Sequence, residues 1–426
     1  MNGSTDRVFV DWLREGPEIG PREGLEQALV ATRRVSQRPG WAIPERWIPM
    51  QLTMSRTSSG RPLLLLASVA LLIAAVVAAA LLAGAQQRVP APFGLARNGV
   101  VAYAADGDIL VRDDPGLAPR ILIGGPALET SPAFSRQGDR IAFVRQRPDG
   151  WDLVVSRIDG TDEHIALALA GGALRQIQGG TWSPDGTRIL VQYVEQAMPK
   201  LAIAMADGSG WRPIEGTGPA DFASWRPDGR QIVFRSQPGD GTQASAAYLA
   251  DADGSNIRRL ELNGSTTSVD DFMDLQWSPD GTRLTYTTES VGINDLGWQI
   301  HIVDVDADGG VLDHPMRFVP GSTDESRVAW SPDGSQISFI LVADGERQIA
   351  VTEPVDGAPV TRVGPTIPSA MGGLGHDWSP DGRTLLVSVF ERSGEFTTWS
   401  VDMATNAMTE VEGVVIDLPS WQRLAP

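Results

Sequence analysis

Five aspartates occupy the same place in a repeated motif, which indicates either shared chemistry or a shared turn. They are Asp185, Asp228, Asp280, Asp333 and Asp381, each preceded by Pro and followed by Gly. Carboxylates can act as acids, bases or metal ligands, but Pro-Asp-Gly is also a tight-turn sequence. In such a turn Pro presets φ, Asp accepts backbone N–H groups and Gly takes a positive φ. We interpret the five aspartates as structural turn residues.

A second set of ionisable side chains lies just before each copy of the motif. If the repeats form a ring whose first strands line a channel, the loops that lead into these strands gather at one mouth. Carboxylates there would attract a cation, a basic peptide or a divalent metal, and the alternative is an ordinary solvated acidic surface. The candidate ligand-binding residues are Asp221, Asp271, Asp274, Asp324, His376, Asp377 and Asp417. The set also includes Glu129, Asp270 and Glu325, and its sparse arginines are Arg175 and Arg327.

Other chemistry is poorly supported. The chain has no cysteine, and its four histidines share no metal-ligand spacing. The segments 251–254 and 304–309 are similar to calcium loops but lack the glutamate at the twelfth position and coincide with expected hairpin turns. No nucleophile is paired with a base at readable spacing, so we expect no enzyme activity, no metal and no cofactor.

These side chains belong to a repeat. An aromatic residue followed by Ser-Pro-Asp-Gly or a variant recurs at intervals of 43 to 53 residues, and each interval contains alternating apolar and polar runs typical of half-buried strands. That period is typical of a four-stranded propeller blade. The aromatic positions are Phe134, Trp182, Trp225, Trp277, Trp330, Trp378 and Trp421.

The two ends of the repeat region complement each other. Residues 99–124 supply three expected strands without an aromatic strand before them, and residues 418–424 supply such a strand. Pairing them would complete a blade and remove two exposed strand edges. We therefore predict an all-β, seven-bladed β-propeller of four-stranded antiparallel blades over residues 98–426, in which the last strand closes the first blade.

An apolar segment precedes the repeats. Residues 63–85 carry no charge over 23 positions, enough for one transmembrane helix at 1.5 Å per residue. A cleavage site at residues 83–85 is the alternative. Six arginines lie between residues 33 and 61, whereas only Arg88 and Arg97 follow closely. The positive-inside rule therefore predicts a cytoplasmic N-terminus, a linker over residues 86–97 and an extracytoplasmic propeller in the cell membrane of a bacterium.

Residues 1–62 have too little apolar content for a sizeable core. We expect a partly disordered cytoplasmic segment with two short helices, over residues 5–14 and 21–36. Residues 1–60 either bind a cytoplasmic regulator or only precede the membrane helix. Residues 89–426 hold 46 acidic against 25 basic side chains, which argues against a nucleic-acid partner.

The four complete Trp-Ser-Pro-Asp-Gly copies and the Trp225-Arg226-Pro227-Asp228-Gly229 variant resemble the repeats of TolB-type propellers, relatives of the WD-repeat class. The resemblance covers about residues 98–426 and implies the propeller fold. The family includes extracytoplasmic binding and scaffold proteins as well as propellers attached to serine peptidases, so it implies no single activity.

We therefore expect a non-catalytic binding or scaffold module, anchored by a single-pass helix, that binds a protein or peptide with basic character. The alternative is a transmembrane sensor, similar in outline to anti-sigma factors. In that protein the propeller would bind a ligand and the N-terminal helices would bind a cytoplasmic regulator.

Overall fold

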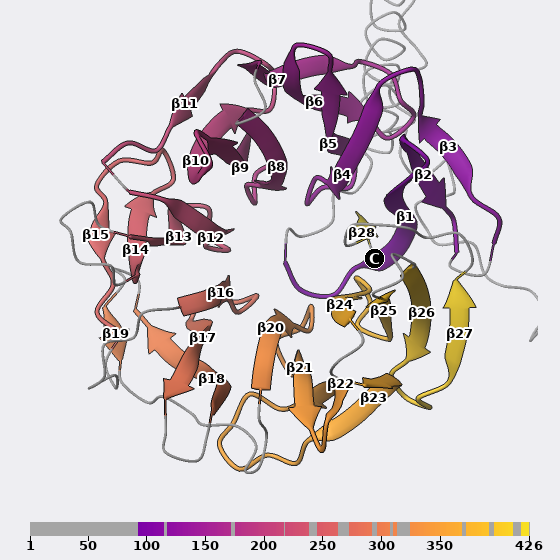
Figure 1. Cartoon of the computed structure of the whole chain (residues 1–426), viewed down its shortest axis with the longest axis vertical. Coiled ribbons are helices and arrows are strands. Elements are labelled where there is room, and N and C mark those ends of the chain that lie inside the picture. Colours follow the sequence, from indigo (N-terminus) through magenta and orange to yellow (C-terminus); the bar gives the residue numbers. More distant parts are fainter. Residues whose placement is uncertain are drawn as a thin grey trace, which may run out of the picture. The chain divides into compact units, whose positions relative to one another are not determined.

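The computed structural model describes residues 93–425 with gaps at 115–116, 172–174, 217, 238–244, 263–271, 292–295, 307–309, 313–323, 369–371, 392–395 and 412–418. The strands of this part form seven four-stranded antiparallel blades around a central axis (Figure 1). The predicted all-β, seven-bladed architecture is confirmed. The expected membrane helix at 63–85 and cytoplasmic segment at 1–62 lie outside the described residues. Among the residues that the structure does describe, no helix combines the length and the apolar composition that a membrane crossing needs.

Each blade runs outward from the axis in chain order, apart from the closing blade. The innermost strands are β4 (Leu128–Phe134), β8 (Arg175–Trp182), β12 (Ala220–Trp225), β16 (Phe272–Trp277), β20 (Asp324–Trp330), β24 (Gly372–Trp378) and β28 (Ser420–Leu424). The second strands are β1 (Arg97–Ala105), β5 (Arg140–Arg147), β9 (Arg188–Glu195), β13 (Gln231–Ser236), β17 (Arg283–Val291), β21 (Ile337–Ala343) and β25 (Thr384–Glu391).

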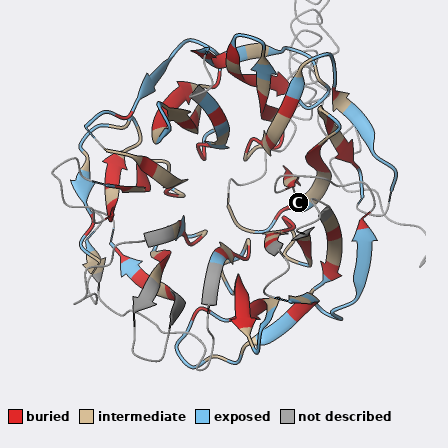
Figure 2. Ribbon diagram, in the orientation of Figure 1, coloured by how far each residue is buried: buried red, intermediate tan, exposed pale blue. Residues whose placement is uncertain are grey.

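The exposed side chains of the blades gather on several of the outermost strands. The third strands are β2 (Asp108–Arg112), β6 (Gly150–Arg157), β10 (Met198–Met205), β14 (Ala246–Asp251), β18 (Leu296–Val305), β22 (Glu346–Thr352) and β26 (Phe396–Asp402). The outermost strands are β3 (Arg120–Ile123), β7 (His164–Ala170), β11 (Trp211–Pro213), β15 (Arg258–Arg259), β19 (Val311–Leu312), β23 (Thr361–Pro368) and β27 (Met408–Val411). Figure 2 shows β3 and β27 as largely exposed ribbons at the rim.

The apolar core lies between the faces of neighbouring blades. One cluster, for example, joins Val144 and Leu153 of the β4–β7 blade to Ile189 and Val191 of the next blade, and all four side chains are at most 1 % exposed. The motif aromatics are part of this core, with exposures of 2 % to 8 %. Burial of such large side chains makes each blade's stability depend on its neighbour.

Guanidinium groups also join neighbouring blades. Arg188 stacks on Trp225, Arg226 on Trp277 and Arg283 on Trp330, with centroid distances of 5.3, 4.8 and 4.8 Å. Each arginine lies one blade before the tryptophan that it covers. Stacking of this kind adds a directional contact to the apolar burial.

The ring closes as the sequence predicts. Strand β28 pairs antiparallel with β1, and Trp421 lies opposite Val101 while Leu424 lies opposite Arg97. The contact joins segments about 320 positions apart, and Figure 1 shows β28 beside β1 near the centre of the ring. The β28–β1–β2–β3 sheet is therefore the composite blade that closes the propeller.

Candidate functional site

The motif aspartates lie in the turns that follow the innermost strands. The Asp185 carboxylate accepts a hydrogen bond from Ser183 Oγ at 2.6 Å and from the Thr187 amide at 3.0 Å. Asp280, Asp333 and Asp381 repeat this pattern, and Asp228 accepts the Arg230 amide at 2.9 Å. These carboxylates replace missing backbone partners in the turn.

The pKa shifts of the turn aspartates agree with a structural role for these residues. Burial acts to raise the pKa of Asp185, but hydrogen bonds from Ser183 and Thr187 outweigh it and bring the pKa below its ordinary value. The same balance lowers the pKa of Asp280 and Asp333. Three of these turn carboxylates are therefore held in the charged form by the loop itself.

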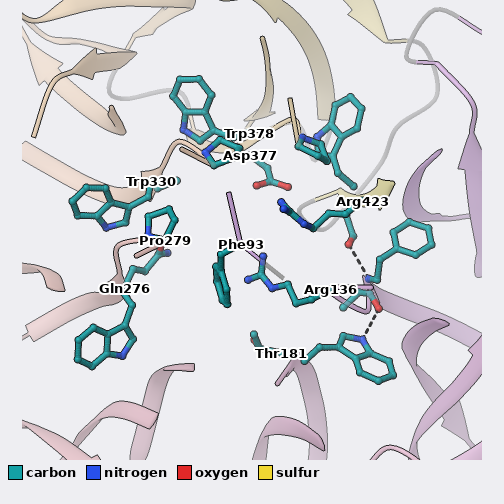
Figure 3. A pocket seen from close by; sticks show the side chains of 18 of the residues that line it. Phe93, Arg136, Thr181, Gln276, Pro279, Trp330, Asp377, Trp378 and Arg423 are labelled. Atoms are coloured by element: carbon teal, nitrogen blue, oxygen red, sulfur yellow. Dashed lines mark hydrogen bonds between the residues drawn. The ribbon is translucent and has the colours of Figure 1, made fainter. Parts of the chain in front are cut away.

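A central cavity of about 780 Å³ lies between the innermost strands (Figure 3). Its wall is built from equivalent positions of successive blades. The residue before the motif aromatic contributes Ala133, Thr181, Gln276, Ala329, Asp377 and Ser420. The residue two positions after the aromatic contributes Arg136, Pro279, Pro332, Pro380 and Arg423.

A repeated bulge shapes the same wall. The position three residues before the aromatic has φ of 53° at Ser131, 48° at Phe222, 58° at Asp274 and 54° at Arg327. The register of the innermost strand shifts at each of these sites. A left-handed conformation costs a residue with a side chain on the order of 1 kcal/mol, and such strain is concentrated at ligand-binding sites. The bulge places Phe222, Asp274 and Arg327 on the cavity wall.

The structure brings three of the sequence-selected ligand residues together on this wall: Asp274, His376 and Asp377. Asp221 lies elsewhere and forms a two-point ion pair with Arg235, at 2.7 Å to Nε and 2.6 Å to Nη2. Asp271 and Asp417 lie outside the described residues. Asp324 belongs to β20, and the structure does not describe its side chain.

The two cavity carboxylates differ in their partners. Asp274 Oδ2 accepts the backbone N–H of Arg327 at 2.7 Å, and burial raises the pKa of Asp274 despite this bond. Burial also raises the pKa of Asp377, to about 7. Attraction to Arg136 and a hydrogen bond from the Trp378 backbone act in the opposite direction but are outweighed by burial. The Asp377 carboxylate is directed toward Arg423 and Arg136 in Figure 3.

His376 lies beside Asp377 on β24. Its side chain is 7 % exposed, and neither ring nitrogen has a hydrogen-bond partner within the described part of the chain. Burial lowers the pKa of His376 to about 4, so its imidazole is neutral at pH 7.

Sequence reasoning missed the arginines. Arg136 and Arg423 stand where five other motif copies have proline. The sequence did contain a signal for these two arginines, because both belong to degenerate copies of the motif, Phe134-Ser135-Arg136 and Trp421-Gln422-Arg423. Together with Arg327, they give the described cavity wall three arginines against two aspartates. The wall is therefore of mixed charge, although the domain as a whole is acidic.

A second missed feature is the segment 93–96, which we call the strap. In Figure 1 it runs into the central opening before β1, and Figure 3 shows the Phe93 ring inside the cavity. The Arg136 guanidinium lies 4.6 Å from the Phe93 ring centroid, and Arg423 Nη2 donates to Gly94 O at 2.6 Å. The Ala96 amide donates to Pro380 O at 2.9 Å. The strap thus contacts both cavity-facing arginines.

The calcium-like segments behave as turns where they are described. Asp253 accepts the Ser255 amide at 2.9 Å, and hydrogen bonds from Ser255 lower the pKa of Asp253 to about 2. In the other segment, Asp306 Oδ1 accepts the Gly310 amide at 2.6 Å, and residues 307–309 are not described. Within the described part, no three histidine, aspartate or glutamate side chains are grouped to hold a metal.

Comparisons with known proteins agree with this geometry. A profile for the TolB beta propeller domain matches residues 98–314. The Tol-Pal system protein TolB of Anaeromyxobacter dehalogenans is 29 % identical over 121 residues, which are 28 % of this chain and 26 % of that protein. The match therefore spans about a quarter of that relative's length.

Two solved structures share the fold at low identity. A puromycin-hydrolysing peptidase of Mycobacterium tuberculosis superposes with a TM-score of 0.55 at 14 % identity, covering 78 % of this chain and 56 % of the peptidase. An oligogalacturonate lyase in complex with manganese superposes with a TM-score of 0.52 at 15 % identity, covering 72 % of this chain and 84 % of the lyase. Similarity at this level concerns the propeller architecture alone.

Proposed function

We propose, because this chain belongs to the TolB β-propeller domain family, that it is a non-catalytic binding module whose central cavity accepts a segment of a protein or peptide partner. The observation that carries the proposal is the cavity of about 780 Å³, which is of the size that proteins use for ligands. Its wall combines apolar surface with a few convergent polar groups, the pattern expected of a binding site.

The composition of the wall favours a peptide-like ligand. Thr181 and Gln276 offer uncharged hydrogen-bonding groups, Phe222 offers an aromatic surface, and Arg136 and Asp377 offer opposite charges within one cavity. A polypeptide segment presents the same mixture of groups. His376 adds to the same wall an imidazole that is neutral at pH 7.

The cellular location is also a proposal. Residues 63–85 would span the cell membrane once, with residues 1–62 in the cytoplasm and the propeller outside. Protease added to intact cells should then digest the propeller and spare a tag at residue 1. Digestion of the N-terminal tag, with a protected propeller, would reverse the orientation.

A cavity-filling variant tests the binding proposal. Thr181 is an exposed residue of the cavity wall, and its backbone oxygen, which a side-chain substitution keeps, accepts a hydrogen bond from Trp225 Nε1 at 2.9 Å. Thr181→Trp should therefore block the cavity while leaving the blade intact. Thr361→Trp, on the exposed side of β23, is the matched control.

The assay uses the full-length chain, crosslinked in native membranes and identified by mass spectrometry. We expect one extracytoplasmic partner with the wild type and with Thr361→Trp, and its loss with Thr181→Trp. Equal recovery with both tryptophan variants would show that the cavity is not the binding site.

The second candidate function is a transmembrane sensor. It is favoured by the strap, because this part of the expected linker after the membrane helix contacts Arg136 and Arg423 in the same cavity. A ligand in the cavity would then compete with the strap, and the N-terminal residues would bind a cytoplasmic regulator. Full-length chain and chain lacking residues 1–60 should be compared by affinity purification. A cytoplasmic protein that requires residues 1–60 would favour sensing, and its absence would favour simple anchoring.

A further inference from the structure

Two arginines replace the ring of prolines at one point in the propeller. Arg136 follows β4 and Arg423 belongs to β28, so the two come from neighbouring blades on either side of the ring closure. The remaining five blades carry Pro184, Pro227, Pro279, Pro332 and Pro380 at the same position. Closure of the ring, rather than sequence proximity, therefore brings two cations to one side of the cavity.

Arg136 and Arg423 are close enough to interact electrostatically inside the cavity. Arg136 depresses the pKa of Arg423, although burial is the larger cause, and together they lower that pKa to about 10. Asp377 is the carboxylate that interacts electrostatically with Arg136, and burial disfavours its charged form. Asp274, the other acid on the wall, is bonded to the backbone of Arg327. A guanidinium such as that of Arg136, beside a second cation and with a weakened counter-charge, favours a bound anion.

The guanidinium group of Arg136 lies on the cavity wall. Within the described part of the chain, Arg136 makes no hydrogen bond, and its partner is the face of the Phe93 ring. A stacked guanidinium still presents its N–H groups in the ring plane, where they can donate to a planar acceptor. Arg423 donates through Nη2 to Gly94 O.

We propose that Arg136 and Arg423 form an anion site that binds a carboxylate group of the partner. This deepens the proposed function, on which it rests, by assigning an acidic group to the segment that enters the cavity. The arginine fork fits a carboxylate through two parallel hydrogen bonds, a stronger and more selective contact than a point charge makes. A free carboxylate and the acidic side chain or C-terminus of a peptide share this chemistry.

The strap is the internal competitor at this site. A carboxylate that accepts a hydrogen bond from Nη2 of Arg423 would compete with Gly94 O, which now accepts from the same nitrogen. Occupancy of the anion site would therefore loosen the contact between the propeller and the segment that precedes it. The hydrogen bond from Arg423 to Gly94 O thus couples the anion site to residues 93–96.

Calorimetric titration of the full-length chain in detergent tests the site with two probes, triglutamate and the free dicarboxylate glutarate. Arg136→Gln removes the charge without removing a described hydrogen bond, and Arg259→Gln on the exposed outermost strand is the matched control. We avoid Arg423→Gln because β28 closes the ring. Asp377→Asn removes the internal counter-charge.

We expect Arg136→Gln to weaken probe binding at least tenfold, Asp377→Asn to tighten it severalfold and Arg259→Gln to leave it unchanged. Tighter binding of triglutamate than of glutarate would identify a peptide source, and equal binding a free anion. No binding of either probe to the wild type, or equal affinities for Arg136→Gln and Arg259→Gln, would overturn the anion site. The Thr181→Trp experiment tests the proposed function separately, because loss of the partner from a blocked cavity does not depend on an anion site.

Discussion

The Asp377→Asn substitution should stabilise the propeller at neutral and alkaline pH. The Asp377 pKa is about 7 in the folded chain against an ordinary value of 3.8, because burial disfavours the carboxylate. An acid with a raised folded-state pKa contributes its full stability below the unfolded pKa and loses it as pH rises through the folded pKa. The loss is about 4 kcal/mol at most. Solvent in the cavity reduces it, so we expect Asn to add about 2 kcal/mol at pH 8.

Urea unfolding of the full-length chain at several pH values measures this difference directly. The free energies of unfolding of wild type and Asp377→Asn should coincide near pH 4, diverge between about pH 4 and 7, and differ by a constant amount above pH 8. Asp113→Asn, at an exposed position outside the cavity, is the matched control. A variant less stable than the wild type at pH 8 would refute the reasoning, because attraction to Arg136 and Arg423 would then exceed the cost of burial.

Three further predictions concern the ring itself. Deletion of residues 420–426 removes β28 and the buried Trp421, so we expect a loss of at least about 4 kcal/mol, seen as a fall in Tm by circular dichroism. Trp225→Phe loses the hydrogen bond to Thr181 O and should cost about 1 kcal/mol more than Trp277→Phe, whose Nε1 has no partner among the described residues; equal urea midpoints would contradict this. Asp280→Ala should cost about 1 kcal/mol, and Asp280→Asn about half as much because its amide oxygen still accepts the Thr282 amide; a larger loss with Asn would exclude the turn explanation.

Much of the fold could be predicted from the sequence because its determinants are local and repeated. The Pro-Asp-Gly turns combine a fixed φ, a side-chain acceptor and a glycine such as Gly281, whose φ is +71°. A motif at blade spacing predicts four strands without knowledge of any distant contact. The pairing of β28 with β1 was also predictable, because each end of the repeat region lacked what the other supplied.

The position and the partners of individual carboxylates could not be predicted from such local patterns. Asp221 lies four residues before its motif aromatic and Asp377 one residue before its own; Asp221 is held by Arg235 on the neighbouring strand, whereas Asp377 faces the cavity. In a regular strand an odd number of positions separates side chains on opposite faces. The left-handed bulges at Asp274 and Arg327 change that alternation again.

By itself the sequence determined the repeating blade, the number of blades and the pairing that closes the ring, because turns and strand periodicity depend on neighbouring residues. Only the tertiary structure decided what the cavity contains. Phe93, Arg136, Asp377 and Arg423 are separated by up to 330 positions and meet because a closed ring brings both ends of the repeat region to one axis. Their charges and burial, and hence the chemistry of the site, arise from that closure.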